Sequence, residues 1–177
     1  MAERIQTEDG TPIGGWVLRS DGRSFDVRPM LEEYGQVFRY PVDPNARVDL
    51  MAPGQPCFLH IGDRSRVVGL WAIGEVVAPA LALPVDPGGE GTDEQLYAEV
   101  ELLALAKPIP DDKLRADPKL ARSELFTAGD RPNPLVLRPV EVRAIEAFDF
   151  ELVPPTDEQA ARLEALLDAE ESDDDAP

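Results

Sequence analysis

Two apolar runs joined by a short polar connection constrain the fold of this chain more than any other feature. The first run, PCFLHI, covers residues 56–61, and the second, VVGLWAIGEVV, covers residues 67–77. Both have the length of a strand, and the connection, which contains GDRS, has the turn residues of a hairpin. Side chains alternate between the faces of a strand, so Cys57 and His60 are expected on opposite faces. The sequence therefore predicts an antiparallel hairpin within a β structure.

The second run holds Trp71 between Gly69 and Gly74, followed by Glu75. Glycine packs nothing and weakens a strand, and it tends to mark a bulge or a close approach of another group to the backbone. We interpret the two glycines as bending the strand and opening room beside it. Trp71 then either fills the core or forms one wall of a ligand groove, while Glu75 is expected to face solvent.

Shorter segments on both sides of this hairpin indicate more strands, with helices between them. We expect strands at residues 14–20, 36–42, 96–105 and 135–138. We expect helices at residues 26–35, 117–126 and 156–171, whereas 139–148 is compatible with either a helix or a strand. Short strands at close spacing with inserted helices predict an α+β fold built on a small, strongly bent sheet or barrel.

The alternation of apolar and polar residues also predicts which side chains of a strand face the core. In the third of these strands, alternation directs Val100 and Leu102 inward and leaves Glu99 and Glu101 in solvent.

Two helix starts carry recognisable signals. Asp117 has the position of an N-cap, with Pro118 in the first helical position. Thr156 and Gln159 form a capping box at the start of the last helix.

The chain divides into four parts along its length. They are a flexible lead-in (1–13), a folded domain (14–150), a C-terminal helix (151–171) and a disordered acidic tail (172–177). Within the domain, residues 84–95 are rich in glycine, proline and acidic residues, which predicts a mobile loop. Residues 107–112 are expected to be a connector.

Charge and composition indicate where in the cell the protein is located. The chain of 177 residues carries 35 acidic and 17 basic residues, a formal net charge of −18. No apolar run approaches the ~20 residues that span a bilayer, and no signal peptide is apparent. A single cysteine cannot form an internal disulfide. We therefore expect a cytoplasmic protein that does not contact membranes.

The residue types of most enzyme active sites are sparse in this sequence. The chain has one histidine, His60, and one cysteine, Cys57, and their opposite faces exclude a shared metal site or a nucleophile pair. The acidic DPGGEG stretch would repel a phosphate, and Glu75 alone is not an acid–base pair. We expect no enzymatic activity and no cofactor. His60 is expected to be a structural histidine or a polar contact at a groove.

Four segments taken in order resemble a known family. They are GGWVLRS, VFRYPV, MAPGQPCFLHIG and VVGLWAIGEVV, and together they are similar to the EVE-domain family of the PUA-like superfamily, which also contains YTH and ASCH domains. The resemblance is carried mainly by GLWAIGEVV and covers about residues 14–150. Gly54 and Gln55 stand where the family has Gly-Asp, and the C-terminal helix and acidic tail lie outside the family pattern.

This resemblance implies a PUA-like mixed β pseudobarrel flanked by helices, with an aromatic pocket for one flipped-out, often modified, base of DNA or RNA. Stacking on aromatic side chains contributes ~1–3 kcal/mol per base. The base-binding candidates by position are Trp71, Phe38, Tyr40, Arg39, Asn133, Arg131 and Ser20. Each has a plainer interpretation as well: core filling for Trp71, edge-strand packing for Phe38 and Tyr40, and ordinary solvation for the loop residues Arg131 and Asn133.

Two functions remain open at this point. The first is a non-enzymatic binding module that recognises a base, possibly modified, in DNA or RNA. The alternative is a protein-interaction or regulatory protein, whose acidic surface and C-terminal helix dock a partner. A strongly acidic chain repels nucleic acid unless its positive charge is clustered. Arginines at the rim of a pocket would therefore favour the first function.

Overall fold

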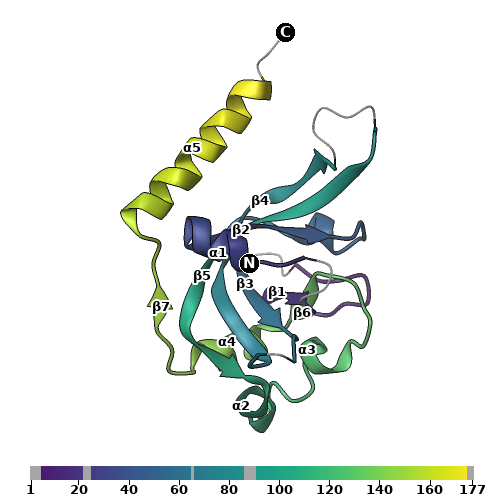
Figure 1. Cartoon of the computed structure of the whole chain (residues 1–177). Coiled ribbons are helices and arrows are strands. Elements are labelled where there is room, and N and C mark those ends of the chain that lie inside the picture. The colour runs from purple at the N-terminus through teal and green to yellow at the C-terminus, as the bar shows by residue number, and fades with distance from the viewer. Residues whose placement is uncertain (1–4, 22–24, 65, 86–90, 175–177) are drawn as a thin grey trace.

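An open, seven-stranded sheet surrounded by helices forms the body of the molecule in the computed structural model, which describes residues 5–21, 25–64, 66–85 and 91–174 (Figure 1). The strands are β1 (Gly15–Ser20), β2 (Gln36–Val42), β3 (Pro56–Ile61), β4 (Gly69–Pro84), β5 (Glu94–Pro110), β6 (Leu135–Leu137) and β7 (Leu152–Val153). The helices are α1 (Arg28–Tyr34), the 3-10 turn η1 (Val48–Leu50), α2 (Asp111–Ala116), α3 (Glu124–Thr127), α4 (Pro139–Glu146) and α5 (Asp157–Asp174). The expected α+β class is confirmed.

The strand order places a parallel pair inside an otherwise antiparallel sheet. The order is β2-β5-β4-β3-β1-β6, with β7 paired to β5. Strands β1 and β3 run parallel, with Trp16 opposite Cys57 and Ser20 opposite Ile61. Their carboxyl ends therefore finish side by side, and the loops that follow them leave the sheet at one place.

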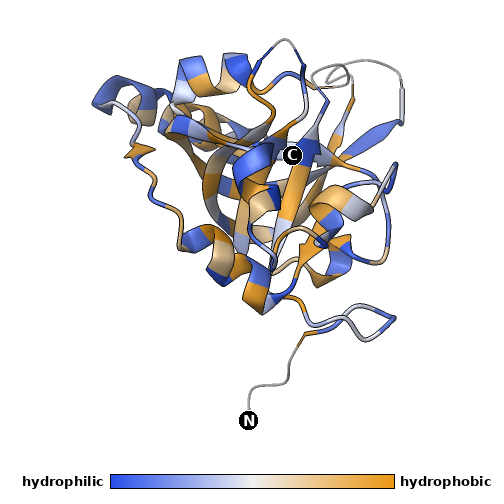
Figure 2. Cartoon of the chain, turned by 90° about the horizontal axis from the view of Figure 1, so that it is seen from below, coloured by the Kyte–Doolittle hydropathy of each residue, from blue (hydrophilic) through white to orange (hydrophobic). Residues whose placement is uncertain are grey.

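The predicted hairpin is confirmed, because β3 and β4 pair antiparallel with Phe58 opposite Ile73. Alternation buries both faces of this region. Cys57 and Leu59 belong to the core cluster on one face, and Phe58 to the cluster on the other. Figure 2 shows hydrophobic residues gathered on the central strands and hydrophilic stretches on the outer helices and loops.

The glycines of β4 have a different role from the expected one. A Cβ at Gly74 would overlap the carbonyl oxygen of Glu101, and a Cβ at Gly69 would overlap that of Ile109. Both oxygens belong to β5, which pairs with β4 through several register shifts. The glycines therefore let two strands of a tightly coiled hairpin approach each other, and they do not open room for a ligand.

Strand β5 is longer than the sequence predicted, so the loop expected at 84–95 and the connector expected at 107–112 are both shorter than predicted. Pro84 pairs with Glu94, so strand residues occupy both ends of the expected 84–95 loop, while 86–90 lie outside the described residues. At the other end β5 continues to Pro110, and α2 starts at Asp111, so 107–112 is not a simple connector.

The continuous helix expected at 117–126 was wrong, although Asp117 does cap the turn that follows it, because its Oδ1 accepts from the amide of Lys119 at 2.8 Å. Asp117 ends α2 with an extended backbone (ψ 119°), and a separate short helix, α3, begins at Glu124. The reason is Pro118, whose ring disfavours the helical conformation for the residue before it. The same proline that suggested a helix start therefore breaks the chain into two helices.

The other helix predictions agree with the structure. Gly35 ends α1 in the left-handed conformation (φ 68°), as expected for a residue just past a helix. The 139–148 segment forms a helix, α4. The capping box of α5 is present, since Gln159 N–H donates to Thr156 Oγ1 and Thr156 N–H to Gln159 Oε1. Helix α5 continues to Asp174, beyond the expected end at Glu171, and 175–177 lie outside the described residues.

The account of Gly74 predicts a specific instability. Gly74→Ala should lower the free energy of unfolding by about 3 kcal/mol, because the added methyl group must displace the β5 backbone. Gly91→Ala is the matched control, since nothing lies within 4 Å of its Cβ position, and it should change stability by less than about 0.5 kcal/mol. Chemical denaturation measures both. Equal stability of the two variants would contradict the close approach.

Candidate functional site

A cleft of about 850 Å³ opens where β1 and β3 end. Strand β1 contributes Arg19 and Ser20, and β3 contributes His60. The opposite walls come from α2, α3 and the loop between α3 and β6. We call this the central cleft and define it by the lining residues that carry chemistry: Arg19, Ser20, His60, Arg115, Phe126 and Asn133.

A smaller cavity of about 220 Å³ adjoins the central cleft and shares Arg19, Asp43 and Asn133 with it. We call it the side chamber. Two aromatic rings, Phe25 and Tyr40, line it and meet edge to face with centroids 5.3 Å apart.

Tyr40 is almost fully buried, and its hydroxyl donates to the carbonyl oxygen of Arg19 at 3.0 Å. Burial raises the pKa of Tyr40 above its usual value. Its hydroxyl therefore stays a donor at neutral pH.

Asn133 attaches the α3–β6 loop to the end of β1. Its side-chain Nδ2 donates to the carbonyl of Arg19, and its Oδ1 accepts from the amide of the same residue, both at 2.8 Å. The Arg19 guanidinium donates in return to the carbonyls of Gly129 (2.7 Å) and Arg131 (3.0 Å). Backbone and side chain of one residue therefore hold the loop that forms a wall of the cleft.

His60 joins β3 to α2 at the floor of the cleft. Its Nε2 lies 2.8 Å from Oδ1 of Asp111, the first residue of α2. The residue is 7% exposed, and among the described residues its Nδ1 has no hydrogen-bond partner. A carboxylate beside Nε2 favours the tautomer with its proton there, which leaves Nδ1 as an acceptor. His60 thus packs as a structural histidine and also lines a groove, which combines the two expectations.

The central cleft is formally neutral in a chain of net charge −18. The four arginines in its lining are Arg19, Arg64, Arg115 and Arg131. The four aspartates are Asp21, Asp43, Asp111 and Asp130. The acidic excess of the chain therefore lies elsewhere, and the cleft is a place where arginine is concentrated.

A partly exposed ion-pair cluster supports the wall that carries Arg131. Glu124 accepts from Arg47 through two bonds of 2.6 and 2.8 Å, from Arg131 at 2.8 Å, and from the amide of Val136 at 2.9 Å. Burial acts to raise the pKa of Glu124, but the bonds from Arg47 and Val136 and the nearby arginine charges outweigh it and lower the pKa below 4.5.

The described residues contain no group of three or more His, Cys, Asp or Glu side chains that could hold a metal ion. Cys57 is buried, and its burial raises the pKa of the thiol to about 12, so it stays protonated at neutral pH. Of the described helices, none is long and apolar enough to cross a membrane.

Four of the residues predicted from the sequence meet at this site. Ser20, Arg131 and Asn133 line the central cleft, and Tyr40 lines the side chamber. They come from β1, β2 and the α3–β6 loop, which the sheet brings together at one end of the parallel pair.

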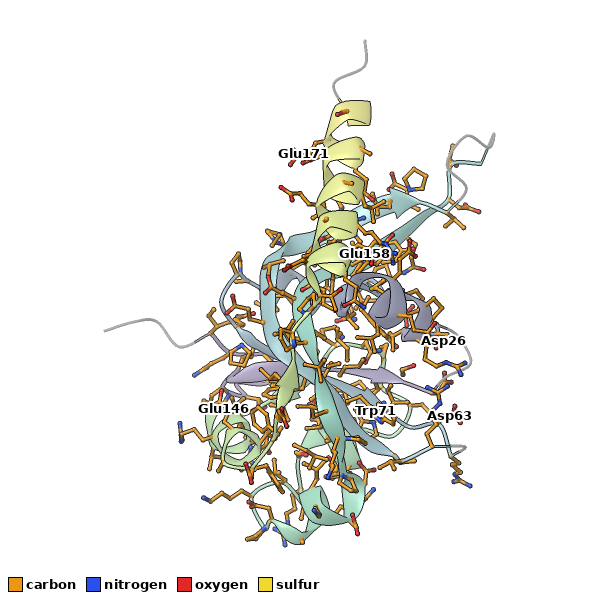
Figure 3. The ribbon with its side chains drawn as sticks, turned by 60° about the vertical axis from the view of Figure 1, so that its left-hand side comes forward. Asp26, Asp63, Trp71, Glu146, Glu158 and Glu171 are labelled. Atoms are coloured by element: carbon orange, nitrogen blue, oxygen red, sulfur yellow. The ribbon has the colours of Figure 1, made fainter. Side chains whose placement is uncertain are left out.

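Trp71 lies outside both cavities. It is half-buried on β4, packs against one core cluster, and donates its indole N–H to the carbonyl of Val67 at 2.9 Å (Figure 3). Trp71 therefore packs against the core cluster and lines neither cavity.

Arg39 and Phe38 lie outside both cavities, and Arg39 binds α5. The Arg39 guanidinium is 11% exposed and bonds Glu99 at 2.7 Å and Glu170 of α5 at 2.8 Å. Phe38 meets Tyr34 edge to face. Glu99, expected in solvent, is instead 14% exposed because it pairs with Arg39.

Sequence reasoning missed Arg115, Phe126 and Phe25. Arg115 and Phe126 stand eleven positions apart in the sequence. Phe126 ends the expected 117–126 helix and Arg115 comes just before it, and a continuous helix would hold the two side chains far apart. They meet only because the chain turns back at Asp117. Phe25 carried no signal beyond an aromatic residue next to a turn.

Comparison with known proteins identifies the fold. No family model and no curated protein matches the chain. Solved structures do match. A hypothetical protein from Leishmania major has 18% identity and a TM-score of 0.55, and the match covers 76% of this chain and 92% of that one. A protein from Pseudomonas syringae has 19% identity and a TM-score of 0.52, with coverage of 75% and 97%. The DUF55 domain of human thymocyte nuclear protein 1 has 16% identity and a TM-score of 0.50, with coverage of 76% and 99%.

These identities establish a likeness in fold. The chain has a fold like that of this DUF55 domain, with an open sheet flanked by helices.

The Glu124 cluster predicts how stability depends on pH. The pKa of Glu124 is lower in the folded than in the unfolded chain, so its stabilising effect is complete above about pH 4.5 and declines as the pH falls further. At pH 7, Glu124→Gln should cost about 2 kcal/mol, the scale of charged hydrogen bonds. The difference in the free energy of unfolding between this variant and the parent protein should narrow as the pH falls below 4.5, as measured by urea unfolding. Glu146→Gln, at an exposed position, is the control, and a constant gap across the pH range would contradict the role of this carboxylate.

Proposed function

We propose that this protein is a non-enzymatic nucleic-acid-binding module that holds one base in the side chamber, while the nucleotide next to it lies in the central cleft. The observation that carries the proposal is the convergence of four arginines and an aromatic-walled chamber at the ends of β1 and β3. The PUA-like fold supports it, as does the resemblance of GLWAIGEVV to EVE domains, which favours a modified base in DNA or RNA.

The side chamber has the chemistry that an unstacked base requires. A base outside its helix needs flat apolar walls and polar groups for its edge. Phe25 and Tyr40 supply rings. Gln95 uses its amide N–H groups on the carbonyls of Val42 (3.1 Å) and Leu96 (2.9 Å), which leaves its side-chain oxygen as an acceptor for a base N–H.

The charge distribution favours recognition of a single nucleotide over tracking of a long strand. A neutral cleft on an acidic protein contacts few phosphates, and each contact contributes about −0.7 to the salt slope for a single strand. With about two contacts, log K should fall against log salt with a slope of about −1.5. A steep slope would instead indicate a backbone-tracking surface.

Affinity measurements on two aromatic variants test the proposal. Single-stranded and duplex oligonucleotides, with unmodified and modified bases, are screened at low salt by fluorescence anisotropy. Phe25→Leu should weaken binding of the best oligonucleotide by about 1–3 kcal/mol, the contribution of stacking one base. Trp71→Ala is the control, because this half-buried aromatic side chain lies outside both cavities. It should leave the affinity for the oligonucleotide unchanged.

Thermal unfolding of both variants confirms that they remain folded. The reverse result, with binding lost in Trp71→Ala and kept in Phe25→Leu, would overturn the placement of the site. Failure of every oligonucleotide to bind would overturn the proposed function.

A protein partner on α5 is a second candidate function, and the surface of the helix favours it. Leu163 is buried, whereas Leu167 is 38% exposed, and carboxylates extend from Glu158 to Glu171 (Figure 3). A basic partner with an apolar groove fits this combination. A photo-crosslinking residue at Leu167 should capture such a partner in cells, whereas one at Glu146 on α4 should not. Equal capture at both positions would contradict docking through α5.

A further inference from the structure

We propose that Arg115, which lies over the Phe126 ring, is the stacking platform in the central cleft for the base next to the one held in the side chamber. The guanidinium carbon of Arg115 lies over the Phe126 ring, 4.0 Å from its centroid, which is within the range of a cation–π contact. Both residues line the central cleft. The inference rests on the proposed function and assigns a role within the same site.

The lower layer of the platform is fixed by packing. Phe126 lies on α3 and packs against the core cluster that contains Val17 and Phe58. Leu125, beside it, is buried in the same cluster. Phe126 therefore has one side anchored in the core and carries Arg115 on its other side, toward the cleft.

The upper layer of the platform is the Arg115 guanidinium, which lacks the carboxylate partner that most other described arginines have. Arg115 makes no hydrogen bond or ion pair with any described residue, whereas Arg131 is bound to Glu124. Asp111 stands four positions earlier on the same helix, a spacing that ordinarily gives an ion pair. Here the Asp111 carboxylate is bound to His60 at 2.8 Å instead. Because Asp111 binds His60, the Arg115 guanidinium is available to a ligand.

The chemistry of the platform defines the class of ligand. A guanidinium plane stacks on the face of a base, and cation–π attraction strengthens the contact when that face is electron-rich. A positive platform repels a base that itself carries a positive charge. The ligand is therefore a neutral base, and a cationic methylated base such as N1-methyladenine or N3-methylcytosine is disfavoured.

Two substitutions at Arg115 separate stacking from charge. Arg115→Lys keeps the charge and loses the plane, and Arg115→Gln loses both. The probe is the oligonucleotide that binds best in a low-salt screen of the full chain, measured by anisotropy. Both variants should bind about tenfold more weakly, the scale of one base-stacking contact. Arg143→Lys, at an exposed position on α4, is the matched control and should bind like the parent.

Two further readouts report on the platform itself. On titration, the Arg115 Nε–H signal in NMR should move upfield, because it comes to lie over the ring of the base. With matched oligonucleotides that differ by one methyl group, the preference for adenine over N1-methyladenine should shrink in Arg115→Gln.

The outcomes distinguish this inference from the function on which it rests. If the parent protein binds and Arg115→Lys binds equally well while Arg115→Gln is weaker, Arg115 acts by charge alone and the platform is overturned. If both variants bind like the parent, the inference falls and the base-binding function stands. If the parent binds no oligonucleotide, both fall.

Discussion

The attachment of Asn133 to the end of β1 organises the end of the molecule where the central cleft and the side chamber open. Two hydrogen bonds of 2.8 Å from one side chain fix the backbone of Arg19, and the Arg19 guanidinium fixes the loop in return. Because β1 and β3 are parallel, the same attachment places this loop beside the residues that follow β3. The central cleft and the side chamber both form around Asn133, which lines each of them.

Charge is distributed so that an acidic protein presents a formally neutral cleft. Four arginines and four aspartates line the cleft, and some of these charges are bound internally, such as Asp111 to His60 and Arg131 to Glu124. Much of the remaining acidity lies on α5, which Arg39 holds to the sheet through Glu170.

Local periodicity and turn chemistry were enough to predict much of the fold. The β3–β4 hairpin, the helix that ends at Gly35 and the capping box at Thr156 all depend on residues close together in the sequence. The candidate site was only partly predictable, because its members meet through long-range contacts. Arg39 looked like a ligand contact until the structure paired it with Glu99 and Glu170, and Arg115 reaches Phe126 only through the break at Pro118.

The central claim is that the ends of β1 and β3 form the binding surface, and amide mapping by NMR tests it most directly. The full chain is titrated at low salt with the best-binding single-stranded oligonucleotide from a screen of modified and unmodified bases. The account predicts shifts concentrated at Arg19, Ser20 and Asn133, with the Trp71 indole N–H signal unmoved. Shifts centred on Trp71 or on α5, with the cleft residues unmoved, would contradict it.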